Sequence, residues 1–221
     1  MEPVTNLRSD FGQFIMPVKT VQSLPRDKQL KILDVGASNH LMKKFLPKNI
    51  EYYSLDVEGE QDYVHNLDEF PIPIKDNTYD IILCLETLEH TLYPHKIMKE
   101  LIRIAKPDAL FLVSMPNEYN FYCRINFLFG RKTLVQEPFQ VIEKHLHIQL
   151  PRAKDIIKFY STYLKIEKID YQWYSRTGGH NPNFKGKISV FIDKMINIFL
   201  TNLYPSLFAR AVVIKGRIRK K

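Results

Sequence analysis

Two aspartates and a glycine occupy positions where a ligand can meet the backbone. Asp34 and Gly36 lie in KILDVGASNH, residues 31–40, where an apolar run ends in a glycine turn. In a parallel sheet, such a turn brings the backbone to a ligand at the carboxyl edge. Asp56 ends the next predicted strand, twenty residues beyond Gly36. At that distance a carboxylate can accept both hydroxyls of a bound ribose. An ordinary turn aspartate at the strand end is the alternative.

Three histidines are candidate general bases. His90 follows the apolar stretch YDIILCL, and His145 and His147 lie two residues apart in an aromatic segment, residues 116–150. An imidazole whose ordinary pKa lies near neutrality suits the deprotonation of a hydroxyl. We choose His145 as the first candidate. Packing at a helix start for His90, and a structural role for the other two, remain open.

Alternating apolar strands and helices are predicted to surround these residues. Short connectors between them favour an α/β fold, a doubly wound and mostly parallel sheet. Residues 1–29 are predicted to form a short helix or loop over one side of that sheet. The predicted strands are 30–35, 51–56, 61–67, 79–85, 109–114 and 163–171, and the predicted helices are 41–46, 94–106 and 151–160.

Two segments interrupt this alternation. Residues 116–150 are rich in aromatic and polar side chains and leave the carboxyl end of a strand, which favours a substrate lid. Residues 172–207 form a predicted helical insertion, in which 187–204 has an apolar face. That face either packs within the domain or on a second copy in a homodimer, or lies on a membrane surface. Residues 208–214 are the last predicted strand.

Composition and charge limit the class of protein. The 221 residues are 45% hydrophobic and 25% charged, as in a globular domain. Five of the eight net positive charges lie in a basic tail, residues 215–221. That tail can attract an anionic membrane surface or can simply fray. Two cysteines, together with no signal-like or spanning segment, indicate a cytoplasmic protein, with peripheral membrane contact through 187–221 as an option.

Four motifs resemble those of the class I S-adenosylmethionine-dependent methyltransferases. The motif at residues 66–90 is the most specific, because it combines a proline-containing turn, an aromatic–Asp strand start and a terminal Leu–Glu–His. The resemblance covers about residues 28–170 and the last strand. The motifs are ILDVGAS (32–38), YSLDVEG (53–59), NLDEFPIPIKDNTYDIILCLETLEH (66–90) and ELIRIAKPDALFLVSMPN (100–117).

The resemblance implies a single domain over residues 1–221, with seven strands and the last one antiparallel beside the fifth. It implies S-adenosylmethionine as the cofactor and in-line methyl transfer, here to a small-molecule, sugar or lipid-linked acceptor, with a hydroxyl favoured. His90 would lie near the pocket mouth. The cofactor contacts would be Asp34, Gly36 and Ala37 at the methionine and ribose end, Asp56 at the ribose hydroxyls, Val57, Asn66 and Leu67 at the adenine, and Cys84 and Leu85 beside the sulfonium.

This sequence departs from the family pattern in its glycine loop and at Asn66. Ser38 and His40 stand where further glycines are usual, and an acid is common where Asn66 stands, although its amide carbonyl can serve the adenine amino group. A G-x-G-x-x-G nicotinamide site is disfavoured, because only Gly36 of its three glycines is present. We predict no metal site.

The sequence also bears on two other classes of function. A non-catalytic module that acts through a partner is the main alternative, since the glycine loop is substituted. Nucleic-acid methylation is disfavoured, because the chain before the tail carries only three net positive charges and the NPPY motif of base methylation is missing.

Overall fold

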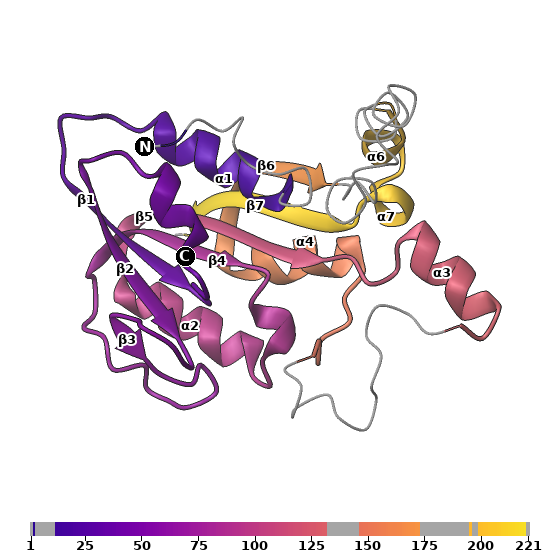
Figure 1. The fold of residues 1–221 in the computed structure, drawn as a ribbon, viewed down its shortest axis with the longest axis horizontal. Helices are drawn as coiled ribbons and strands as arrows, with labels where there is room; N and C mark the ends of the chain where they lie inside the picture. The colour runs from indigo at the N-terminus through magenta and orange to yellow at the C-terminus, as the bar shows by residue number, and fades with distance from the viewer. Residues whose placement is uncertain (1, 3–11, 132–145, 173–194, 196–198, 220–221) are drawn as a thin grey trace.

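A seven-stranded sheet forms the centre of the computed structural model, which describes residues 2, 12–131, 146–172, 195 and 199–219 (Figure 1). The strand order is β3-β2-β1-β4-β5-β7-β6. The strands are β1 (Leu30–Val35), β2 (Ile50–Asp56), β3 (Tyr63–Val64), β4 (Tyr79–Leu85), β5 (Ala105–Pro116), β6 (Leu164–Gln172) and β7 (Ala211–Ile218).

Strands β1 to β5 run parallel, and β7 is reversed between β5 and β6. This confirms the predicted sheet with its antiparallel last strand. Asp34 pairs in register with Ser54 of β2 and with Leu83 of β4. The carboxyl ends of β1, β2 and β4 therefore meet at one edge, as the glycine turn required.

Helices cover both faces of the sheet (Figure 1). One face packs under α1 and η3, where Val18, Met42 and Ile81 are buried. The other packs under α2 and α4, where Leu101, Ile156 and Phe111 are buried. Because β4 and β5 are covered on both sides, their sequences are continuous apolar runs. The helices are α1 (Gly12–Gln22), η3 (Leu41–Phe45), η4 (Leu88–His90), α2 (Pro94–Ile104), α3 (Phe121–Leu128), α4 (Ala153–Tyr163), α6 (Thr201–Leu203) and α7 (Pro205–Phe208).

Several element boundaries differ from the sequence prediction. The predicted strand 61–67 contracts to Tyr63–Val64, because Asn66 accepts a hydrogen bond from the Asp68 amide and turns the chain. The predicted helix 41–46 is a five-residue 3₁₀ helix, which begins after left-handed His40. The leading residues 12–22 are helical despite an internal proline.

The last strand lies further along the chain than residues 208–214. Residues 205–208 form α7, and β7 continues to Ile218. Part of the predicted basic tail is therefore in the sheet. Arg217 Nε lies 2.9 Å and Lys215 Nζ lies 3.4 Å from the Glu167 carboxylate of β6, so these charges are paired across two strands.

The two predicted insertions are only partly described. Within 116–150, α3 is capped by Asn120, whose side chain accepts from the Cys123 amide. Most of the predicted helix 187–204 lies outside the described residues, as does His145. Within the described ranges, none of the helices combines the length and apolar character that crossing a membrane requires.

Candidate active site

The turn after β1 needs glycine for two reasons. Gly36 has φ +72°, and a Cβ at this position would collide with the side chain of Thr87. The Gly36 amide donates to the Leu55 carbonyl at 2.8 Å. Thr87 Oγ1 donates to the Val35 carbonyl at 3.0 Å and lies 3.1 Å from the Leu85 carbonyl. The ends of β1, β2 and β4 are thereby fastened together.

Asp56 faces this turn from the end of β2. One carboxylate oxygen accepts from the Ser38 amide at 2.8 Å, and the other accepts from the Val57 amide at 2.7 Å. Each oxygen keeps acceptor capacity, because a carboxylate has about four lone-pair sites. The side chain is half-buried and held in one orientation, and the neighbouring Val57 is 47% exposed. This pair offers a polar acceptor beside an apolar surface.

Asp34 is buried and engaged on the inner side of the site. Its carboxylate accepts from the Tyr52 hydroxyl at 2.8 Å, and only 5% of the residue is exposed. Burial raises the pKa of Asp34 to about 7, although the Tyr52 hydrogen bond and His40 act to lower it. The two predicted acids therefore lie on neighbouring strand ends in different environments.

The remaining predicted cofactor residues follow the same edge. Ala37 is nearly buried in the turn, Asn66 is exposed after β3, and Leu67 packs into the core beneath it. Cys84 and Leu85 end β4 and are buried; burial raises the pKa of the Cys84 thiol well above its ordinary value. Cys84 packs among core side chains, so its contribution at this edge is through the backbone.

Two of the three predicted histidines meet. The rings of His90 and His147 lie edge to face with centroids 4.6 Å apart. The amides of Ile148 and Gln149 both donate to the Glu89 carbonyl, at 2.7 and 2.9 Å. These bonds hold the segment after His147 against η4, although 57 residues separate the two histidines in the sequence.

Two glutamates beside the histidines were missed by the sequence reasoning. Glu118 Oε1 accepts from Nδ1 of His147 at 2.6 Å. Glu89 is fully buried, and neither of its carboxyl oxygens has a hydrogen-bond partner within the described part of the chain. Burial, with Glu86 and Glu118 nearby, raises the pKa of Glu89 well above its ordinary value. For Glu89, the available signal was a charged residue four positions after the buried strand β4; Glu118 gave none before the fold was known.

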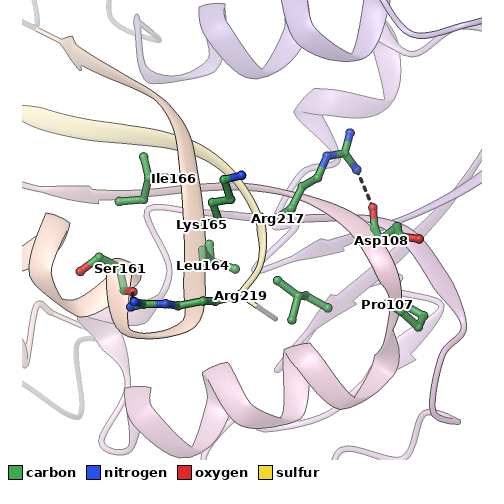
Figure 2. Close-up of a pocket in the computed structure, with 9 residues that line it drawn as sticks. Pro107, Asp108, Ser161, Leu164, Lys165, Ile166, Arg217 and Arg219 are labelled. Atoms are coloured by element: carbon green, nitrogen blue, oxygen red, sulfur yellow. Dashed lines mark hydrogen bonds between the residues drawn. The ribbon is translucent and has the colours of Figure 1, made fainter. Parts of the chain in front are cut away.

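A cavity of about 340 Å³ adjoins this cluster. Its walls are largely apolar or aromatic, and Glu118 belongs both to the wall and to the histidine cluster. The lining residues are Glu118, Tyr119, Cys123, Arg124, Phe127, Leu128 and Leu150. A larger cavity of about 700 Å³ lies at the opposite, amino edge of the sheet, where Arg217, Arg219 and Lys165 contribute to its wall (Figure 2).

The methyltransferase domain family matches residues 10–165, more than half of the chain. The chain belongs to this family. The class I assignment predicted from the motifs is confirmed, and with it an enzyme whose methyl donor is S-adenosylmethionine. No sequence among curated proteins matches this methyltransferase significantly.

Solved structures of similar fold differ widely in sequence from this methyltransferase. A chain in the complex between the Haloferax volcanii Trm112 methyltransferase activator and a methyltransferase has a TM-score of 0.57 at 14% identity, covering 94% of this chain and 91% of that one. A SAM-dependent methyltransferase from Archaeoglobus fulgidus has 0.51 at 17%, covering 93% and 94%. The [4+2]-cyclase SpnF has 0.53 at 13%, covering 91% and 80%. At such identities the likeness concerns the fold alone.

The carboxyl edge of this methyltransferase fits its cofactor chemically. Gly36 lets the Thr87 side chain pack directly against the turn, and Asp56 has carboxylate oxygens of the kind that ribose hydroxyls require as acceptors. Val57 supplies exposed apolar surface for a flat base. In the substituted glycine loop, Ser38 adopts φ +45° and its amide donates to the Asp56 carboxylate.

Proposed function

We propose that this methyltransferase methylates a hydroxyl of a small-molecule, sugar or lipid-linked acceptor. The observation that carries the proposal is the pairing of His147 with Glu118 at the wall of the 340 Å³ cavity. An imidazole oriented by a carboxylate beside an apolar cavity suits an acceptor whose proton must be removed.

The cofactor would be held by the carboxyl edge described above. Asp56 would accept the ribose hydroxyls, Val57 would contact the adenine face, and Asn66 with Leu67 would meet the adenine edge. Gly36 and Ala37 would admit the methionine end, near buried Asp34. When bound, S-adenosylmethionine supplies a methyl group that leaves a positively charged sulfur for the acceptor oxygen, while the sulfur keeps the electron pair.

The acceptor would occupy the cavity beside α3. Tyr119, Phe127 and Leu128 give it apolar and aromatic walls, which favour a ring or a lipid-like body over a highly charged one. Arg124 adds a cation at the wall; its Nε donates to the Tyr119 carbonyl at 2.6 Å. We assign the segment 116–150, which contains α3, the role of acceptor wall and lid.

The acceptor hydroxyl would lose its proton at the histidine cluster. Glu118 accepts at Nδ1 of His147, so this nitrogen carries a hydrogen and Nε2 has the free lone pair. A proton taken up at Nε2 would place a positive charge on the ring, which the Glu118 carboxylate stabilises. The chain's other task is to align the acceptor and exclude water, because the donor is already activated.

An acceptor screen with a radiolabelled methyl donor tests this function. The panel contains phenols, sugars and lipid-linked glycans, each with a matched compound that carries an amine in place of the hydroxyl. We expect label on a hydroxyl compound. Label on the amines alone would overturn the hydroxyl assignment. Donor binding without transfer to any compound would favour a non-catalytic module instead.

A further inference from the structure

The Glu89 carboxyl group is unusually placed for an acid. The residue has no solvent exposure, and among the described residues neither carboxyl oxygen has a hydrogen-bond partner. Its Oε1 lies 3.9 Å from Nε2 of His90, beyond hydrogen-bond distance. A buried polar group without such bonds is costly, and a buried unpaired charge is costlier still. Either a proton or a cation has to neutralise this carboxylate.

Two imidazoles converge on the same point. Glu89, His90 and His147 each offer one ligand atom, and these atoms all lie within 4.8 Å of one another. Around a tetrahedral ion with ligand distances of 2.0–2.2 Å, neighbouring ligand atoms lie about 3.3–3.6 Å apart. Small side-chain rotations would therefore bring the three atoms onto a single ion. Elements η4 and residues 146–150 hold them in place through the two amide bonds to the Glu89 carbonyl.

His147 also has the outer contact that a metal-binding histidine usually has. Its Nδ1 hydrogen is donated to Glu118 at 2.6 Å, which fixes the ring and leaves Nε2 as the coordinating atom. Glu118 is nearly buried; its side chain is 6% exposed. Nearby Glu86 is engaged separately, since it accepts from the Ser114 hydroxyl at 2.8 Å.

We propose that Glu89, His90 and His147 bind one divalent first-row transition-metal ion, with Glu118 as the positioning residue. Two imidazoles and one carboxylate are ligands that suit ions such as Zn²⁺ and Mn²⁺, whereas Mg²⁺ and Ca²⁺ prefer oxygen ligands alone. Three protein ligands leave coordination positions for water or for an acceptor oxygen.

The metal site deepens the proposed function. Only the role of the ion in turnover rests on that function; the binding of the ion does not. An acceptor hydroxyl bound to the ion would have a lowered pKa and would release its proton to water, leaving an alkoxide or phenoxide on the ion. With the ion bound, His147 is a ligand; without it, Nε2 is the proton acceptor described above. Methyl transfer should therefore persist weakly in the metal-free protein and rise when the ion is added.

Direct metal binding tests the site independently of methyl transfer. Tag-free protein is treated with a chelator and dialysed separately against Mn²⁺, Zn²⁺ or Mg²⁺, and bound metal is measured by elemental analysis, with electron paramagnetic resonance for Mn²⁺. We expect one equivalent per chain. Glu89→Gln and His147→Gln should each weaken binding at least about 10-fold, and Glu118→Gln should weaken it by roughly 10- to 100-fold.

His95→Gln is the matched control, because it removes an exposed imidazole on α2 whose Nδ1 contacts the Tyr163 hydroxyl. It should leave metal binding unchanged. His147→Gln changes a partly exposed group, whose side chain is 27% exposed, so it keeps the test informative if buried Glu89→Gln fails to fold. Less than half an equivalent bound, binding of Mg²⁺ alone, or equal affinity in wild type and all three variants would overturn the site. Cofactor titration of the same samples separately reports the proposed function.

Discussion

Glu118 accepts the Nδ1 hydrogen of His147 at 2.6 Å, although 29 residues separate the two in the chain. Glu118 follows β5, and His147 precedes α4. The contact therefore joins the two ends of the segment that carries α3. The Glu118 amide donates to the Pro151 carbonyl at 3.1 Å, which anchors the same closure through the backbone. The pair therefore orients an imidazole and positions the cavity wall together.

Replacing His147 with glutamine should lower turnover without weakening cofactor binding. The variant loses the Nε2 lone pair that takes up a proton or binds an ion, and such a group contributes roughly 10²- to 10⁴-fold to rate. Initial rates with the acceptor found in the screen, at saturating donor, measure the effect. His95→Gln should retain wild-type turnover. Equal rates in both variants would remove His147 from the chemistry.

Gly36→Ala should destabilise the fold more than Gly130→Ala does. Both glycines have positive φ, +72° and +61°, so both variants share the strain of a left-handed alanine, about 1 kcal/mol. At Gly36 the new methyl group would collide with Thr87, whereas no described residue lies within 4 Å of a Cβ at Gly130. Urea unfolding of the two variants isolates the collision. Similar losses of stability would show that the turn relaxes without cost.

Asp34→Asn should stabilise the protein increasingly as the pH rises from 5 to 7. The native pKa of Asp34 is raised from 3.8 to about 7 by burial, with Asp56 adding to the rise and His40 and Tyr52 opposing it. The folded state thus binds more protons than the unfolded state in this range, and stability falls with pH. The full penalty above pH 7 is on the order of 4 kcal/mol, and about 2 to 3 kcal/mol of it develops between pH 5 and 7.

Urea unfolding of wild type and Asp34→Asn at pH 5, 6, 7 and 8 checks this sign. Asparagine keeps an oxygen for the Tyr52 hydroxyl, so the comparison isolates the charge. The stability difference should grow up to pH 7 and then level. A constant difference across the series would mean that Asp34 is ionised throughout.

Asn117 should be a stability determinant of the acceptor side. It is buried at the end of β5, and its Nδ2 donates to the Ala209 carbonyl at 2.7 Å. Its Oδ1 accepts from the amides of Tyr119 and Ala153 at 3.3 and 3.2 Å. Asn117→Ala should lower the free energy of unfolding by roughly 2 to 4 kcal/mol, because the Ala209 carbonyl and the amides of Tyr119 and Ala153 lose this hydrogen-bond partner. Asn117→Asp keeps the oxygen acceptors, so a loss as large as that of alanine would show that the Nδ2 donor dominates.

Local patterns predicted the sheet well. The apolar runs at 30–35 and 79–85 match β1 and β4 to the residue, because buried strands need continuous hydrophobicity. The predicted strand boundaries are wrong where tertiary contacts, rather than the local pattern, determine where a strand ends. The edge strand β3 depends on the Asp62 carboxylate, which accepts from the amide and hydroxyl of Ser54, and β7 extends because Glu167 neutralises Lys215 and Arg217.

The candidate site could be predicted only where the ends of consecutive strands form it. Gly36 and Asp56 follow consecutive strands, so topology alone brings them to one edge. Glu118 gave no signal, because its role depends on a histidine 29 residues away. Glu89 lies inside the motif at residues 66–90, yet its burial follows from residues 146–150, which pack back against η4. Long-range contacts of this kind leave no local periodicity in the sequence.

Calorimetric titration with S-adenosylmethionine tests the central claim, that the carboxyl edge formed by Gly36 and Asp56 binds the methyl donor. Wild type should bind one equivalent. Asp56→Asn should bind about 10- to 100-fold more weakly, because hydrogen bonds to the ribose lose their charged acceptor. Asp108→Asn, at the opposite edge of the sheet, should match wild type. Failure of wild type to bind at millimolar donor, or equal affinity in all three proteins, would contradict the account.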